Sequence, residues 1–107
     1  MFDNLIDNAL EVAPTGSTVQ IALRPSGGLV EVHVIDHGPG LTSQQRVHAF
    51  DRFWRGPAAT PGGTGLGLAI VAQLAATCGG RAELLPSSNG GIDAVVRLPV
   101  APGSHDA

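Results

Sequence analysis

Apolar residues recur along the chain with two periods, one typical of helices and one typical of strands. Residues 1–13 carry apolar side chains at helical spacing, which predicts a helix that ends at Pro14. Residues 66–78 have a similar pattern, and Gly79 is typical of a residue that closes a helix in the left-handed conformation. Between them, Thr42 and Gln45 have the spacing of a capping box, which predicts a short helix to about Phe50.

Four other segments alternate between apolar and polar residues, as strands do. Residues 18–24 place Val19, Ile21 and Leu23 on the inward face, and residues 29–36 follow after a Pro-Ser-Gly-Gly turn. The two segments predict an antiparallel hairpin, and residues 81–85 and 91–98 predict a second one.

The order is therefore helix, hairpin, short helix, helix, hairpin. It predicts an α+β protein, a two-layer α/β sandwich with an antiparallel or mixed sheet and helices packed on one face. We expect one domain over residues 1–99 and a disordered tail over residues 100–107, where the pattern ends.

The charged residues exclude several kinds of chemistry. The chain of 107 residues has a net charge of −3 and contains no Lys, so all six basic residues are Arg. A P-loop lysine and a Schiff-base lysine are excluded, and a clustered basic face for nucleic acid is not expected. No apolar run is long enough for a membrane span, and no secretory signal is visible. The single Cys excludes an internal disulfide, and we expect a cytoplasmic protein without membrane contact.

Glycine is enriched in the middle of the chain. Seven of the fifteen Gly residues fall between residues 36 and 67. Residues 62–68 form a Gly-rich loop that leads into the second long helix, where backbone N–H groups suit an anion. Leu68 stands where a dinucleotide fingerprint requires Gly, and the absence of Lys excludes a Walker A loop. The alternative is a helix-start loop without a ligand.

Three other features have both a functional and a purely structural interpretation. Asn4 and Asn8 share one helical face; their amide oxygens suit Mg²⁺, or they are solvated surface. Asp36 ends a buried strand before Gly-Pro-Gly, where it can accept a hydrogen bond from an exocyclic amine or simply form a turn. Residues 50–55 combine aromatic anchors with Arg55, which can reach a phosphate, or they form a small local core.

Together, in this order and spacing, the four features resemble the catalytic ATP-binding domain of sensor histidine kinases, in the superfamily shared with DNA gyrase, the heat-shock ninety-type chaperones and the mismatch-repair ATPases. Residues 4–9 resemble its N box, 36–40 its G1 box, 50–55 its F box and 63–71 its G2 box. The resemblance covers about residues 1–99 and implies a Bergerat fold.

The resemblance also implies roles for individual residues. Asn8 would hold the Mg²⁺ that bridges the triphosphate, with Asn4 supporting it, and Asp36 would bind the adenine amine. Arg55 would stabilise charge during transfer. Gly38 and Gly40 would shape the adenine pocket, and residues 41–63 would form a lid. The G2 loop would bind phosphate, in part through backbone amides. Its binding residues would be Gly63, Thr64, Gly65, Leu66 and Gly67.

Some positions depart from the family pattern. Glu11 and Val12 stand where a basic residue followed by an aromatic is usual, so weakened ATP binding is expected. Cys78 stands where His is common, and we interpret it as a small buried hydrophobe. The upstream part of the domain and the phosphoacceptor His are missing, so we expect an N-terminally truncated domain or the ATP-binding half of a split kinase.

The implied function is that of an incomplete protein histidine kinase. The chain would bind Mg-ATP and donate the γ-phosphate to a histidine on a separate dimerisation domain or protein, and a response regulator would be reached indirectly. Two alternatives are a non-catalytic nucleotide-sensing interaction module and another ATPase or serine kinase of the superfamily, such as an anti-sigma factor.

Overall fold

The computed structural model describes residues 1–51, 54, 67–88 and 90–100, which form three helices and four strands. In chain order these elements are α1 (Phe2–Val12), β1 (Gln20–Ser26), β2 (Leu29–Ile35), α2 (Ser43–His48), α3 (Gly67–Thr77), β3 (Arg81–Pro86) and β4 (Ile92–Pro99). The predicted order of helices and hairpins is confirmed, with bounds that shift by one or two residues. Of the expected tail over residues 100–107, residues 101–107 lie outside the described part of the chain, and the Val100 amide donates to the Gly28 carbonyl at 3.0 Å.

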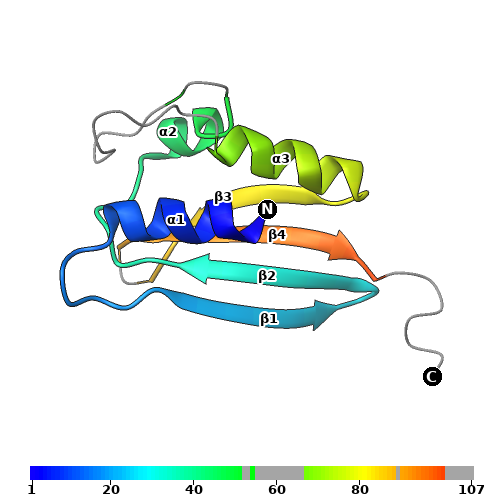
Figure 1. Cartoon of the computed structure of the whole chain (residues 1–107), viewed down its shortest axis with the longest axis horizontal. Helices are drawn as coiled ribbons and strands as arrows, with labels where there is room; N and C mark the ends of the chain where they lie inside the picture. Colours follow the sequence, from blue (N-terminus) through cyan, green and yellow to red (C-terminus); the bar gives the residue numbers. More distant parts are fainter. Residues whose placement is uncertain (52–53, 55–66, 89, 101–107) are drawn as a thin grey trace.

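The strands form one sheet in the order β1-β2-β4-β3, and every described pair is antiparallel. Helices α1 and α3 pack against each other, α1 over β2 and α3 over β3 and β4, so both lie on one face of the sheet (Figure 1). The predicted two-layer α/β sandwich is confirmed. Strands β2 and β4 are neighbours at the centre of the sheet, so the end of β2 lies beside the start of β4 although the two are distant in sequence.

The core lies between the helix layer and the sheet. Leu5 of α1 and Val71 of α3 meet Val34 and Val96 of the two central strands there, and all four are buried. Phe50 and Trp54 pack against this core with partly buried side chains, as expected of aromatic anchors.

The ends of the second and third helices follow their local sequence. Thr42 caps α2: its hydroxyl accepts from the Gln45 amide at 3.1 Å while the Gln45 side chain accepts from the Thr42 amide at 2.8 Å. Gly79 follows α3 with a φ of +80°, as its position predicts. The expectation that Cys78 is buried is wrong: its side chain is exposed, because it lies past the last residue of α3 in the turn toward β3.

The expected inward face of β1 is only partly confirmed. Ile21 pairs with Val34, and Leu23 pairs with the equally buried Val32, so both point to the helix side of the sheet. Their side chains nevertheless remain 57% and 68% exposed. None of the described helices packs extensively against β1, so nothing in the described part of the chain covers this edge of the sheet.

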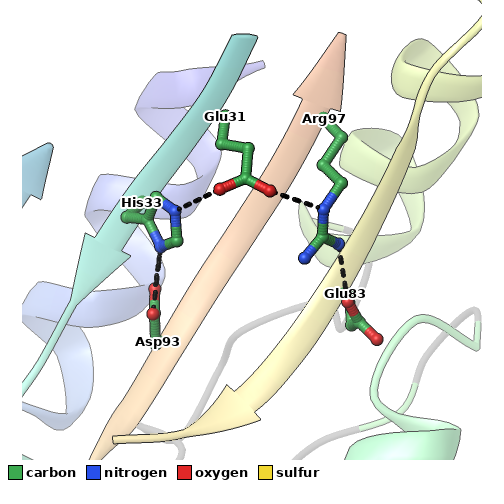
Figure 2. Close-up of polar contacts among 5 residues, drawn as sticks. All are labelled: Glu31, His33, Glu83, Asp93 and Arg97. Atoms are coloured by element: carbon green, nitrogen blue, oxygen red, sulfur yellow. Dashed lines mark hydrogen bonds and ion pairs between the residues drawn. The ribbon is translucent and has the colours of Figure 1, made fainter. Parts of the chain in front are cut away.

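The opposite face of the sheet carries a polar network across three strands (Figure 2). His33 contacts Asp93 at 3.0 Å and Glu31 at 3.1 Å. Arg97 donates to Glu31 at 2.9 Å and to Glu83 at 2.6 Å. The network links β2, β4 and β3, and it connects residues that are up to 66 positions apart in the chain.

These contacts change the proton affinities of the network. Hydrogen bonds from His33 and then Arg97 lower the pKa of the Glu31 carboxyl, because they favour its charged form. The Glu83 and Glu31 carboxylates raise the pKa of the Arg97 guanidinium in return. Arg97 thus forms ion pairs with Glu31 and Glu83 on the two neighbouring strands, which supports the register of the sheet.

Candidate functional site

The site begins with Asp36, directly after the last residue of β2. Asp36 is only 4% exposed and is the one buried charged residue among the described residues, whereas Asp is seldom fully buried in proteins. Its amide donates to the Ile92 carbonyl at 2.9 Å. Its Oδ1 accepts from the amides of Gly38 at 2.8 Å and Ile92 at 3.2 Å. The backbone of two segments that are distant in sequence therefore fixes the orientation of this carboxylate.

The second oxygen of this carboxylate, Oδ2, accepts no hydrogen bond from a described residue. The described hydrogen bonds of Asp36 all reach Oδ1. A fixed, largely desolvated carboxylate with one free acceptor suits an exocyclic amine on a flat ring.

Glycine makes room around Asp36. A Cβ on Gly91 would lie 2.7 Å from Asp36 Oδ1 and 2.8 Å from its carbonyl carbon, closer than real side chains come. A Cβ on Gly38 would lie 3.0 Å from both Cγ2 and the carbonyl oxygen of Val12. Gly40 has a φ of +75° and lies against the carbonyl of Gly90. The glycines therefore bring the end of α1, the end of β2 and the β3–β4 turn together.

Asn4 and Asn8 lie on the flank of α1 that leads to this junction. Asn4 is half-buried and Asn8 is exposed. They are four residues apart, and Val12, which contacts Gly38, is four residues further, so all three share one side of the helix. The side of α1 that carries the asparagines therefore ends, at Val12, in contact with the segment that follows Asp36.

Other predicted site residues lie at or beyond the edge of the described part. Gly67 opens α3, the helix that packs against α1, and a Cβ on it would meet open space. Five further residues lie outside the described residues: Arg55, Gly63, Thr64, Gly65 and Leu66.

Two residues that shape the site, Ile92 and Gly91, were not predicted from the sequence. Ile92 supplies a backbone donor and acceptor to Asp36, and Gly91 gives it space. Backbone groups carry no side-chain signature, so Ile92 could not have been found. The signal for Gly91 was a pair of glycines, Gly90 and Gly91, at the start of a predicted strand.

A hollow of about 460 Å³ lies beside this junction. Its walls come from the segment after Gly38 and from the β3–β4 turn: Pro39, Gly40, Leu41, Thr42, Gln45, Pro86, Ser87, Gly90 and Gly91. Asp36, Asn4 and Asn8 do not line it, so it does not coincide with the side chains discussed above.

The fold is that of a class of protein, the ATPases built on a two-layer α/β sandwich. The family model described as "Histidine kinase-, DNA gyrase B-, and HSP90-like ATPase" matches residues 1–102. The chain belongs to this family.

Its relatives are sensor kinases. The sensor-type histidine kinase PrrB of Mycobacterium tuberculosis is 44% identical over 98 residues, which cover 91% of this chain and 22% of PrrB. The sensor-like histidine kinase SenX3 of Mycolicibacterium smegmatis is 37% identical over 102 residues, which cover 92% of this chain and 27% of SenX3. The chain therefore spans about a quarter of the length of the curated relatives it matches.

Solved structures agree. The mycobacterial sensor histidine kinase MprB superposes with a TM-score of 0.83 at 33% identity, covering 90% of this chain and 67% of the solved one. Full-length ShkA, solved in complex with AMPPNP, superposes with a TM-score of 0.77 at 30% identity, covering 92% of this chain and 20% of ShkA. The chain thus has the fold of the ATP-binding domains of sensor histidine kinases.

No helix in the described part of the chain is long and apolar enough to cross a membrane.

Proposed function

We propose that this chain binds Mg-ATP and donates the γ-phosphate to a histidine on a separate phosphoacceptor domain or protein. The observation that carries the proposal is the buried Asp36 carboxylate, held through Oδ1 by two backbone amides, with no described residue bonded to Oδ2. We place the reaction in the cytoplasm, where ATP is available.

The adenine end of the site fits its ligand. The Oδ2 atom of Asp36 accepts a hydrogen bond from the 6-amino group of adenine. Gly38 and Gly91 keep side-chain atoms away from the carboxylate, so a flat ring can approach it. A base with a carbonyl at the same position would place two acceptors against each other in a largely desolvated site, which gives selectivity for adenine.

At the other end of the proposed site, the triphosphate is bound without a lysine side chain. The amide oxygens of Asn8 and Asn4 suit Mg²⁺, which keeps several water and phosphate ligands and needs few from protein. Bound Mg²⁺ would neutralise charge on the phosphates. Helix α3 begins at Gly67 and packs against α1, the helix that carries the two asparagines. We assign Arg55 and residues 63–66 to the phosphates from their place in the sequence motifs.

The reaction is a phosphoryl transfer. A ring nitrogen of the acceptor histidine attacks the γ-phosphorus, the bond to the β,γ-bridging oxygen breaks, and ADP leaves. Positioning and electrostatic stabilisation supply most of the catalysis in such transfers. The acceptor belongs to another polypeptide or domain, and a response regulator would receive the phosphate from that histidine.

Incubation with γ-labelled ATP tests this proposal. The acceptor is PrrB from which the region that matches this chain has been removed. The expected result is an acid-labile phosphate on the acceptor that appears only when chain, ATP and Mg²⁺ are all present. The Asn8→Ala variant should abolish labelling, while Gln20→Ala, an exposed substitution on β1, should retain it.

Three outcomes would count against the proposal. Label on this chain alone would contradict transfer to a separate acceptor. Acid-stable label would indicate phosphoserine, as in the serine kinases of the superfamily. ATP binding by calorimetry without any transfer would favour a nucleotide-sensing module.

A further inference from the structure

The polar network on the sheet face opposite α1 and α3 reaches the Asp36 region through Asp93 (Figure 2). Ile35 and Asp93 form the last pair of the ladder between β2 and β4. Asp36 and Ile92 come directly after that pair, and the Asp36 amide donates to the Ile92 carbonyl at 2.9 Å. The Ile92 amide donates in turn to Asp36 Oδ1 at 3.2 Å. A side-chain contact at Asp93 therefore lies one residue away from the backbone that orients the Asp36 carboxylate.

His33 of β2 makes this side-chain contact. Its Nδ1 atom lies 3.0 Å from both carboxylate oxygens of Asp93, and its Nε2 atom lies 3.1 Å from Glu31 Oε1 (Figure 2). The His33 side chain is only 12% exposed, and those of Glu31 and Asp93 are each 20% exposed. Val95, directly opposite His33 on β4, has no exposed surface, so the network lies over it. The two contacts are therefore partly shielded from water, and one of them ties β2 to β4 beside the end of the ladder.

The two contacts of His33 require two N–H donors. A neutral imidazole has one N–H group and one bare nitrogen, whereas the protonated ring donates from both nitrogens. When His33 is neutral, one of its nitrogens therefore faces a carboxylate with no hydrogen between them, and that contact is unfavourable. The attraction between the positive ring and both carboxylates is lost in either tautomer. The tie to Asp93 therefore depends on the proton that His33 carries.

The strands on both sides of His33 carry other charged groups on the same face. Arg24 of β1 lies opposite Glu31. Arg97 of β4 donates to Glu31 and to Glu83 of β3. Carboxylates and guanidinium groups stay charged between about pH 5 and pH 8, the range in which histidine changes its charge. Among the described residues of the network, His33 is therefore the one whose charge changes with pH in this range.

We propose that His33 is a positioning residue that makes adenine binding at Asp36 dependent on pH. The protonated ring holds Asp93 against β2, and the adjoining Ile92 backbone then keeps the Asp36 carboxylate in place. As the pH rises and the ring loses its second proton, this hold weakens and the affinity for ATP falls. The inference rests on the proposed function, because it concerns the same carboxylate and the same ligand.

Calorimetric titration with Mg-ATP at pH 6 and at pH 8 tests the proposal. Phosphate groups and the neighbouring His37 titrate in this range as well, so wild type and variant are compared at the same pH. His33→Leu lacks the contact at both pH values and should match the ATP affinity of wild type at pH 8. At pH 6 it should bind ATP about three- to fivefold more weakly than wild type, the size of one cross-strand pair interaction.

Two further variants separate positioning from a general loss of stability. Asp93→Asn offers an amide N–H to the bare nitrogen of neutral His33, so at pH 8 it should bind ATP about threefold more tightly than wild type. Glu83→Gln is the matched control, because it weakens the ion pair with Arg97 at the other end of the network. It should keep the wild-type dependence of ATP affinity on pH. Circular dichroism checks that each variant is folded.

NMR of the ¹⁵N-labelled chain gives a readout that needs no nucleotide. In wild type, the Ile92 amide should shift between pH 6 and pH 8 with the same midpoint as the ring of His33. In His33→Leu this shift should disappear, while any shift caused by His37 remains in both chains.

Two results would overturn the proposal. The first is the same dependence of ATP affinity on pH in wild type and in His33→Leu. The second is an Ile92 amide that titrates alike in both chains, since the network would then not reach the Asp36 backbone. A chain that binds no ATP at either pH would contradict the proposed function instead, and the amide titration would still decide whether His33 acts on Ile92.

Discussion

Gly91 offers a direct way to disturb Asp36 without changing its charge. In Gly91→Ala the added methyl group would lie 2.7 Å from Asp36 Oδ1 and 2.8 Å from its carbonyl carbon. The obstruction is backbone and a buried carboxylate, so the strand ends must move apart. Overpacking of this kind costs about 1–3 kcal/mol. We expect that loss in the free energy of unfolding, measured by urea denaturation, and a loss of ATP affinity of at least about tenfold by calorimetry.

Gly80→Ala is the matched control for Gly91→Ala. Its Cβ would clash with the Arg97 carbonyl and lie 3.1 Å from Leu98 Cδ2, far from Asp36 along the sheet. It should lose comparable stability yet bind ATP as wild type does at a temperature where it is folded. The reasoning would be refuted if Gly91→Ala kept wild-type ATP affinity, or if both variants lost affinity in proportion to their stability.

Three other predictions concern stability, each measured by urea denaturation. Thr42→Ala removes the capping box of α2 and should cost about 1 kcal/mol; no change would mean that the cap is irrelevant to the folded state. Val71→Ala removes two methyl groups from a side chain with no exposed surface and should cost about 2 kcal/mol, whereas a loss below about 0.5 kcal/mol would contradict tight packing there. The pKa of Glu31 is lowered in the folded state, so the ionised carboxylate stabilises the fold. This contribution to the free energy of unfolding is complete above the pKa of the unfolded chain, and it is lost as the pH falls through the folded-state pKa. Glu31→Gln should therefore lose less stability than wild type between about pH 5 and pH 3, and parallel losses would contradict the pKa shift.

The elements of the fold could be predicted because their signals are local. The capping box at Thr42 and the left-handed Gly79 depend on nearby residues only, and both appear as expected. The burial of Ile21 and Leu23 was overestimated because alternation shows which face a side chain points to. It does not show whether a helix covers that face.

The site was predictable only in its side chains. Asp36 was identified from its place between a buried strand and a glycine turn, and its burial supports that interpretation. The contacts that orient it come from Gly38 and from Ile92, which is 56 residues away, through backbone amides, and these carry no side-chain signature. The polar network around His33 and Arg97 could not be predicted either, because its members come together only through the register of β2, β4 and β3.

The central claim is that Asp36 binds the amine of adenine in Mg-ATP. Calorimetric titration of the chain with ATP and with inosine triphosphate, both with Mg²⁺, tests it most directly, because the two nucleotides share their phosphates and differ at the base where adenine carries its amine. An acceptor facing an acceptor in a desolvated site costs about 1–3 kcal/mol. We therefore predict that ATP binds at least about tenfold more tightly than inosine triphosphate. Equal affinity for the two nucleotides would contradict the account.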